Sequence, residues 1–180
     1  MLRDYDTGKL MFTYDGGAFI DRPDNRDYPL SAVAATDPHP KVDFAAGFML
    51  PEPPNEEQGQ SLSCVAQAWS YFHWQLSRKD LTRRSLYCRI YLPQGGAYIR
   101  DGGLRLVKTG QSTRDEASDP TPQTEASMRS QEGITDAQGA SDRLTDLRSL
   151  DWNTIEYVAH TIPLFGGVVF GVYGTNEGWQ

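Results

Sequence analysis

The sequence predicts a protein of the α+β class, with helices in its middle and a strand near its end. Apolar residues recur at three- and four-residue steps in several segments after Ser63, which is typical of helices that bury one face. Val168–Tyr173 is rich in β-branched and aromatic residues and is bounded by glycines, which is typical of a strand. Hydrophobic residues make up 38% of the 180 residues, enough for the core of one domain or of two small lobes that share a cleft.

Four segments have helical patterns: Ser63–Arg78, Leu81–Tyr91, Ile99–Thr109 and Trp152–Ile162. The apolar face of the first consists of Val65, Ala68, Trp69, Phe72 and Leu76. Ser61 or Ser63 is the expected N-cap of this helix, and Gly110 is the expected C-cap of the third. The glycine pair Gly102-Gly103 lies inside the third pattern, where we interpret it as an aid to close packing.

The remaining segments are predicted as one strand and several connections. Lys9–Tyr14 is an apolar-rich run before the turn residues Asp15-Gly16-Gly17, as expected for a strand that ends in a turn. Pro93-Gln94-Gly95-Gly96 separates the second helix from the third. Residues 111–142 are rich in Ser, Thr, Asp, Pro and Gln and poor in large apolar residues, so we expect a long surface loop there.

The composition argues against several classes of partner. The net charge is −7, from 17 basic and 24 acidic residues, and no run of Lys or Arg is present, so we expect no nucleic-acid partner. No apolar stretch is long enough to span a bilayer, and the N-terminus lacks the apolar core of a signal peptide, so we expect no membrane association. No metal-ligand spacing or phosphate-binding glycine loop occurs, and we expect no cofactor.

Cys64 is the most informative residue of the chain, because it opens the first predicted helix. The helix dipole at that end is expected to lower the pKa of its thiol and to favour a nucleophilic thiolate. Gln58, six residues earlier, offers a side-chain amide that can donate a hydrogen bond to an oxyanion. The alternatives are a small buried cysteine and a solvated loop glutamine.

The Gln-x5-Cys spacing and the cysteine-led helix resemble the active-site segment of papain-like cysteine peptidases. The resemblance covers Val42 to Trp179 and implies a two-lobe papain-like fold. Its helical lobe would be led by the Cys64 helix, and its β-barrel lobe would be incomplete in this chain. Val42-Asp43-Phe44 is similar to the opening strand of the family, so residues 1–41 are expected to be an N-terminal extension and residues 42–180 the peptidase domain.

The resemblance implies a peptidase that forms an acyl-enzyme at Cys64, with Gln58 and the Cys64 backbone N–H in the oxyanion hole. The substrate would be a peptide or protein. Gly95 and Gly96 resemble the pair that lines the substrate cleft, where the lack of Cβ permits close approach, and Tyr98 would help to line a specificity pocket. A plain turn at the glycines, and a Tyr98 that covers the start of a helix, are the alternatives.

The catalytic histidine of the family has no counterpart in this chain. His39 precedes the domain, His160 lies near the end of the last predicted helix, and His73 lies about 13–14 Å along the helix from Cys64. In the family this histidine comes later than the last residue here, Gln180. We therefore expect a C-terminally truncated piece, or a chain whose histidine comes from a C-terminal segment or a partner chain. The 180-residue chain alone is expected to be inactive on peptides.

Two other functions remain open from the residues. One is a papain-like module that binds extended peptides through Gly95-Gly96 without catalysis, and the other is a thiol amidase or transpeptidase with the same nucleophile. Secreted members of the family usually carry a disulfide-bonded cysteine three residues before the nucleophile, where this chain has Ser61. With Cys88 as its one further cysteine, the chain is expected to be cytoplasmic, without a Cys64–Cys88 disulfide.

Overall fold

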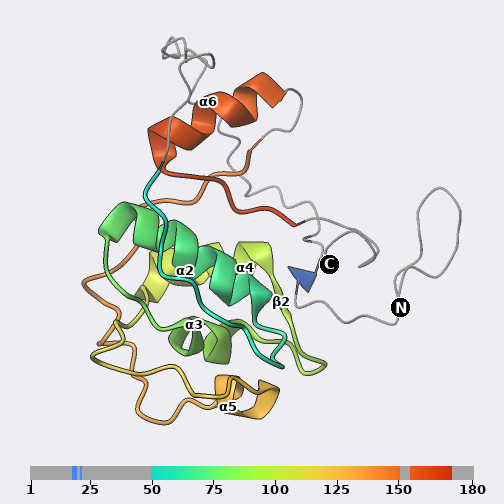
Figure 1. Ribbon diagram of the computed structural model, residues 1–180, viewed down its shortest axis with the longest axis vertical. Helices are drawn as coiled ribbons and strands as arrows, with labels where there is room; N and C mark the ends of the chain where they lie inside the picture. Colours follow the sequence, from blue (N-terminus) through green and yellow to red (C-terminus); the bar gives the residue numbers. More distant parts are fainter. Residues whose placement is uncertain (1–17, 20, 22–49, 151–154, 172–180) are drawn as a thin grey trace, which may run out of the picture.

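A computed structural model of the chain describes residues 18–19, 21, 50–150 and 155–171 (Figure 1). The elements in chain order are β1 (Ala18–Phe19), α2 (Cys64–Ser77), α3 (Arg83–Ile90), β2 (Ala97–Tyr98), α4 (Ile99–Thr109), α5 (Glu125–Arg129) and α6 (Ile155–Phe165). The predicted strands over Lys9–Tyr14 and Val42-Asp43-Phe44, and the domain boundary at residues 41 and 42, lie outside the described residues.

Helices α2, α3 and α4 pack against one another and form the body of the molecule (Figure 1). Helix α5 packs on α3, and α6 lies at the opposite end of the molecule from α5. Strands β1 and β2 form a parallel pair, with Ala18 opposite Ala97 and Phe19 opposite Tyr98. This pair is the one sheet in the described part of the chain, so the β-barrel lobe stays a prediction.

The four predicted helices are confirmed as α2, α3, α4 and α6, within a few residues at each end. Two details differ from expectation. Leu76, expected on the buried face of α2, is 50% exposed, because the buried residues of that helix end before its last turn. Ser63 occupies the N-cap position of α2, but its hydroxyl pairs with the Ser61 hydroxyl at 2.7 Å and makes no capping hydrogen bond.

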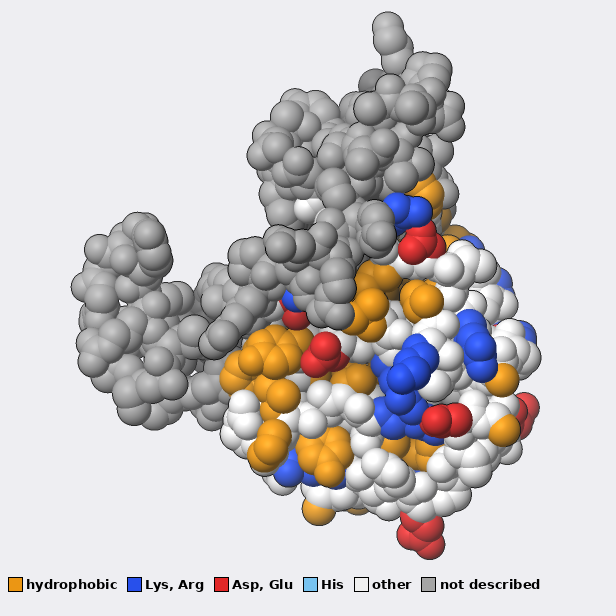
Figure 2. Space-filling view, turned by 180° about the vertical axis from the view of Figure 1, so that it is seen from behind, with side chains coloured by type: hydrophobic (Ala, Val, Ile, Leu, Met, Phe, Trp, Pro, Cys, Tyr) orange, Lys and Arg blue, Asp and Glu red, His pale blue; other side chains and the backbone are white. Residues whose placement is uncertain are grey.

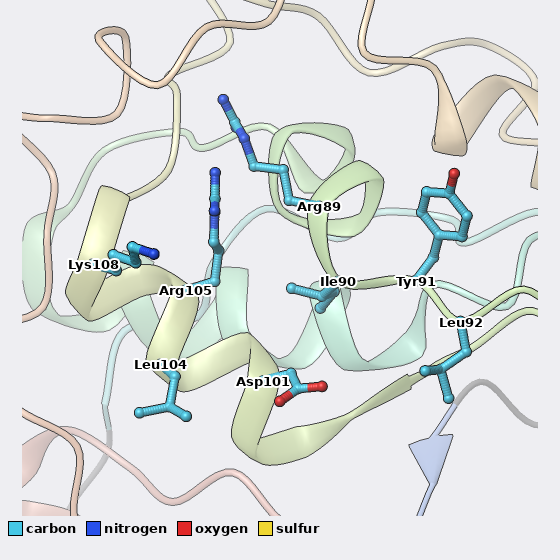
Figure 3. Close-up of a pocket in the computed structure, with 8 residues that line it drawn as sticks. All are labelled: Arg89, Ile90, Tyr91, Leu92, Asp101, Leu104, Arg105 and Lys108. Carbon is cyan, nitrogen blue, oxygen red and sulfur yellow. The ribbon is translucent and has the colours of Figure 1, made fainter.

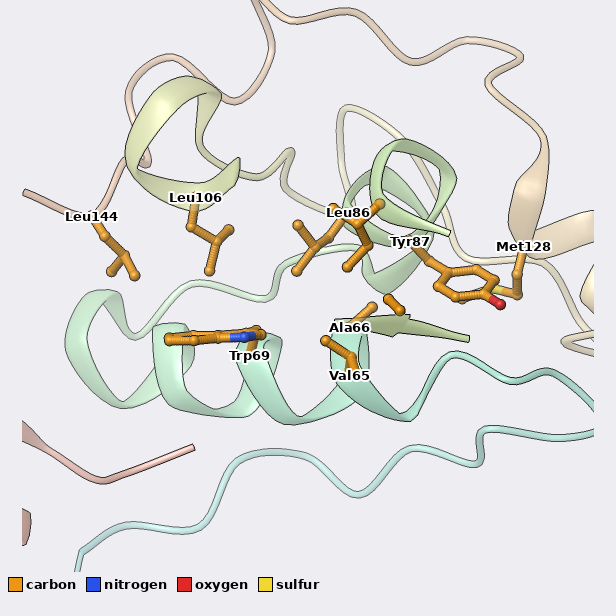
Figure 4. Packing of buried hydrophobic residues seen from close by; sticks show 10 residues of the cluster. Val65, Ala66, Trp69, Leu86, Tyr87, Leu106, Met128 and Leu144 are labelled. Carbon is orange, nitrogen blue, oxygen red and sulfur yellow. The ribbon is translucent and has the colours of Figure 1, made fainter. Parts of the chain in front are cut away.

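Trp69 of α2 lies at the centre of the contact with α4 (Figure 4). Its indole Nε1–H donates to the Ile99 carbonyl oxygen at 2.7 Å, which satisfies the ring nitrogen at the helix–helix contact. A Cβ at Gly102 would lie 2.7 Å from Nε1, and one at Gly103 would lie 2.8 Å from Cζ2. The interpretation of the glycine pair as an aid to close packing is therefore confirmed.

The predicted surface loop over residues 111–142 is wrong in part. Met128 of α5 is fully buried in the core, Ala117 is 7% exposed, and Gln111 and Ser112 are fully buried. The segment contains few large apolar residues, and for that reason its composition suggested exposure. Some of its polar groups bind backbone groups of α3 and of the residue before it: Gln111 Nε2 donates to the Thr82 carbonyl oxygen at 2.9 Å, and Gln131 Nε2 donates to the Cys88 carbonyl oxygen at 3.1 Å. These bonds offset part of the cost of removing the groups from water.

The N-terminal ends of α3 and α4 receive carboxylates from distant segments. Asp119 accepts hydrogen bonds from the backbone N–H groups of Arg83 and Arg84 at 3.1 and 2.8 Å. Asp21 accepts one from the backbone N–H of Arg100 at 2.9 Å. A carboxylate at this end satisfies otherwise unpaired N–H groups and complements the helix dipole, and such contacts contribute about 1 kcal/mol each.

The predicted strand over Val168–Tyr173 is wrong for residues 168–171, which belong to no strand, and residues 172–173 lie outside the described residues. Gly166 and Gly167 have φ values of 79° and 150° and turn the chain back over α2, next to Leu76 and Phe72. Val169 then packs against the core while Phe170 is 55% exposed, and β-branched composition alone did not distinguish this arrangement from strand pairing.

Substituting Gly103→Ala should destabilise the fold. The new methyl group would lie 2.6 Å from Leu147 Cδ1 and 2.8 Å from Trp69 Cζ2, an overpacking that costs about 1–3 kcal/mol. This cost of overpacking exceeds the gain in helix stability, roughly 1 kcal/mol, that alanine gives over glycine inside a helix. Urea unfolding measures the difference. Leu104→Ala, at a 47% exposed position of the same helix, is the control and should change stability by less than about 0.5 kcal/mol.

Candidate functional site

Cys64 is the first residue of α2, as the sequence predicts, and its side chain is partly buried beside the core. The first turn of α2 contains no acidic residue, and the side chain of its N-cap makes no capping hydrogen bond to the helix backbone. This differs from α3 and α4, whose N-terminal N–H groups bind Asp119 and Asp21. The positive end of the α2 dipole is thus directed at the thiol and at any anion formed there.

Gln58 lies in a tight turn that leads into α2. Its side-chain Nε2 donates to the Ser61 carbonyl oxygen at 2.6 Å, and the Ser61 hydroxyl donates back to the Gln58 carbonyl oxygen at 2.8 Å. Gly59 has a φ of 61°, and the backbone N–H of Gln60 donates to the Gln123 carbonyl oxygen at 3.0 Å. An amide NH₂ carries two donors, so the second N–H of Gln58 has no partner among the described residues.

Gly95 and Gly96 have φ values of 94° and 72°, which favour glycine, and both are buried. The Gly95 N–H donates to the Leu92 carbonyl oxygen at 2.8 Å, and the Gly96 carbonyl oxygen accepts from the Leu92 N–H at 2.9 Å. The Gly96 N–H donates to the Tyr87 hydroxyl oxygen at 2.9 Å. Of the four backbone groups, the Gly95 carbonyl has no partner among the described residues, and peptide binding at this pair stays a prediction.

Tyr98 follows the glycine pair in β2 and is partly exposed. Its ring contacts that of Phe19 in β1, with centroids 5.8 Å apart. Strand β1 covers one edge of β2. The assignment of Tyr98 to a specificity pocket stays a prediction.

No catalytic base is identified among the described side chains. His73 is 3% exposed in the third turn of α2, and its Nδ1 has no hydrogen-bond partner among the described residues. Burial lowers the pKa of His73, although Asp142 and Gln111 oppose the shift. His39 lies outside the described residues. His160 is part of α6, and its side chain is not described.

Hollows on the surface of the described residues include two that bear on the site. One of about 400 Å³ lies between α3 and α4, where Arg89 and Arg105 extend side by side (Figure 3). Both guanidinium groups bind the Asp136 carboxylate, at 2.9 and 2.7 Å. The other, of about 320 Å³, separates α2 from residues 166–170. Figure 2 shows basic side chains gathered on one face of the molecule beside hydrophobic ones. Neither hollow is lined by Cys64.

The described residues show neither a metal site nor a membrane-spanning element. They contain no cluster of three or more His, Cys, Asp or Glu side chains suited to a metal ion. None of the helices in this part of the chain is long and apolar enough to cross a bilayer.

The helix arrangement and the cysteine that begins α2 define a fold similar to that of a cysteine protease. The solved structure of Xylellain, a cysteine protease from Xylella fastidiosa, superposes with a TM-score of 0.57 and 19% sequence identity. The match covers 87% of this chain, which spans 65% of the length of that protease. No protein-family profile matches the sequence, and no curated protein matches it significantly.

The sequence did not reveal the carboxylate that holds the turn before Cys64. Glu125 Oε2 accepts the backbone N–H of Leu62 at 2.7 Å, across 63 residues of sequence. The one local signal is the capping box of α5, in which Thr124 and Ser127 exchange side-chain and backbone hydrogen bonds. That signal predicts a helix start beside Glu125, but it does not indicate which distant backbone group this side chain binds.

Iodoacetamide should modify Cys64 and leave Cys88 unmodified in the folded protein near neutral pH. Cys88 is 1% exposed, and burial raises the pKa of its thiol despite the nearby Arg89. Buried thiols of this kind are inert, whereas a partly exposed cysteine at a helix start reacts. Peptide mass mapping measures both positions, with the guanidinium-unfolded protein as the control in which both react. Modification of Cys88 first would contradict the assignment.

The free energy of unfolding should fall as the pH drops below about 6.5, the ordinary pKa of histidine, partly because of His73. Burial lowers the pKa of His73 in the folded chain, so the unfolded chain binds protons more readily in this range. Urea unfolding at about pH 7 and about pH 5.5 measures the loss. His73→Gln should show a smaller loss over this interval, and an equal loss in both proteins would exclude His73 as its source.

Proposed function

We propose that the protein is a cysteine-type peptidase that cleaves peptide bonds through an acyl-enzyme at Cys64. The observation that carries the proposal is the position of this thiol at the start of α2, in a fold similar to that of a cysteine protease. The absence of an acidic residue from the first turn supports it, because a carboxylate there would oppose a thiolate.

The reaction would proceed by acyl transfer. The Cys64 thiolate attacks the carbonyl carbon of the scissile bond, and the resulting oxyanion accepts hydrogen bonds from the Cys64 backbone N–H and from the free N–H of Gln58. Collapse of the tetrahedral intermediate breaks the C–N bond, and an imidazolium gives its proton to the leaving amine. Water then attacks the thioester, which releases the acid and restores the thiolate.

The imidazole of this mechanism would come from outside the described side chains. His73 is excluded because it lies on the third turn of the helix that Cys64 begins, roughly 13–14 Å away at the usual rise. We propose that a C-terminal segment or a partner chain supplies the base, with His160 of α6 as the alternative within this chain.

The substrate would be an extended peptide or protein segment that passes Gly95-Gly96, with Tyr98 beside one of its side chains. Two observations support this binding mode. The glycine pair has positive φ values and no Cβ, and Tyr98, two residues after Gly96, is partly exposed. The same nucleophile and oxyanion donors would also suit an amidase or a transpeptidase, in which an amine replaces water in the second step.

A second candidate is a module that binds peptides without cleaving them. The observation that favours it is that the one described imidazole, that of His73, lies buried and away from Cys64. Peptide affinity that is unaffected by Cys64→Ala, together with a thiol that no peptidyl electrophile modifies, would support this function over catalysis.

In a protein assayed together with the segment or partner chain that supplies the base, Cys64→Ala should abolish both hydrolysis of a fluorogenic peptide and covalent labelling by a peptidyl epoxide, without loss of the folded state. Gln58→Ala should lower kcat by about 10²- to 10³-fold, the usual effect of losing one oxyanion donor. Gln60→Ala is the matched control, because this exposed side chain lies in the same turn and should leave kcat unchanged. Hydrolysis that persists in Cys64→Ala would refute the peptidase assignment.

A further inference from the structure

A partly buried hydrogen-bond network joins the turn before Cys64 to the glycine pair. One oxygen of the Glu125 carboxylate, Oε2, accepts the Leu62 backbone N–H at 2.7 Å. The other, Oε1, accepts the Tyr87 hydroxyl at 2.6 Å. The Tyr87 hydroxyl oxygen in turn accepts the Gly96 backbone N–H at 2.9 Å. Two side chains therefore connect backbone groups that lie 34 residues apart in sequence.

The direction of each bond in the network is fixed by chemistry. Tyr87 is fully buried beside Met128 (Figure 4), and burial together with the Glu125 carboxylate raises the pKa of its hydroxyl far above the ordinary value. Burial alone would raise the pKa of Glu125, but hydrogen bonds from Leu62, Tyr87 and Arg129 lower it below the ordinary value. Glu125 thus stays an acceptor and Tyr87 a donor to it at neutral pH.

The backbone of Gly95 also lies directly against the Leu62 side chain. A Cβ at Gly95 would collide with the Leu62 side chain, and it would lie 3.3 Å from Oε1 of Glu125. The glycine therefore lets the turn at residues 92–96 approach the turn before α2 as closely as it does. Since Leu62 lies two residues before Cys64, the network sets the distance between the nucleophile and the segment proposed to bind the peptide.

We propose that Glu125 and Tyr87 are positioning residues of the Cys64 site, which hold the nucleophile turn and the Gly95-Gly96 segment in register for an extended peptide. This inference rests on the proposed peptidase function. Neither side chain need touch the substrate: Tyr87 acts through Gly96, and Glu125 acts through Leu62. Both bonds to Glu125 involve a charged acceptor, so they are stronger than bonds between neutral groups.

The test compares two rate constants at Cys64. A peptidyl chloromethyl ketone needs both the thiolate and the peptide-binding segment, whereas iodoacetamide needs the thiolate alone. In Tyr87→Phe the Gly96 N–H loses its acceptor, and we expect the second-order rate constant for the peptidyl reagent to fall about tenfold, through a weaker KI. The rate constant for iodoacetamide should stay within about twofold, because Cys64 itself is not altered.

Tyr91→Phe is the matched control, because it removes a hydroxyl from a more exposed tyrosine that directly follows α3. It should change neither rate constant. Glu125→Gln is the second variant, for use if Tyr87→Phe does not fold. It keeps the size of the side chain and an acceptor for Leu62 but loses the charge, and it should lower the peptidyl rate constant at least about threefold.

The outcomes separate the two proposals. A wild-type protein that reacts with the peptidyl reagent no faster than with iodoacetamide contradicts the peptidase function, and the inference fails with it. A wild-type preference for the peptidyl reagent that persists unchanged in Tyr87→Phe and Glu125→Gln leaves the function intact and overturns the positioning role alone. A purely structural role would lower both rate constants together, in proportion to the folded fraction, and would also overturn it.

Discussion

Two carboxylates from residues 111–142 bind the start of α3 and the turn before α2, and the arrangement of the site depends on them. Asp119 binds the first N–H groups of α3, and Glu125 binds the backbone N–H of Leu62 before α2. Both acids come from a segment with few large apolar side chains of its own. Asp119 thus provides partners for the free N–H groups of α3, whereas Glu125 fixes the turn two residues before α2 and leaves the first N–H groups of that helix to other partners.

A second group of charges ties the same segment to residues before α2. The Arg114 guanidinium binds Glu56 and lies 3.2 Å from Asp80 and 3.5 Å from Asp119. Arg83, 1% exposed, donates to Asp80 and to the Leu81 carbonyl oxygen. Buried charges are costly to remove from water, so such a network contributes less to stability than to geometry.

Local patterns predicted the parts of the fold that are locally determined. Periodicity gave α2, α3, α4 and α6, and Gly110 ends α4 as expected, with a φ of 71°. The position of Cys64 at a helix start followed from the same pattern. The role of residues 111–142 could not be predicted from the sequence, because hydrogen bonds such as that between Glu125 and Leu62 join positions far apart in the chain. Composition records neither distance in space nor the partner of a polar group.

The hydrogen bonds that the glycine pair already makes limit how a peptide can bind there. The Gly95 N–H and both polar groups of Gly96 already have partners, which leaves the Gly95 carbonyl oxygen as the acceptor without a partner among the described residues. A substrate N–H that donates to this oxygen keeps the existing network, provided that the buried backbone opens toward it. A substrate carbonyl that takes the Gly96 N–H would displace the Tyr87 hydroxyl, which would keep its bond to Glu125 but lose the Gly96 donor. Since that exchange breaks one hydrogen bond for each one it forms, the first mode is favoured by the structure as it stands.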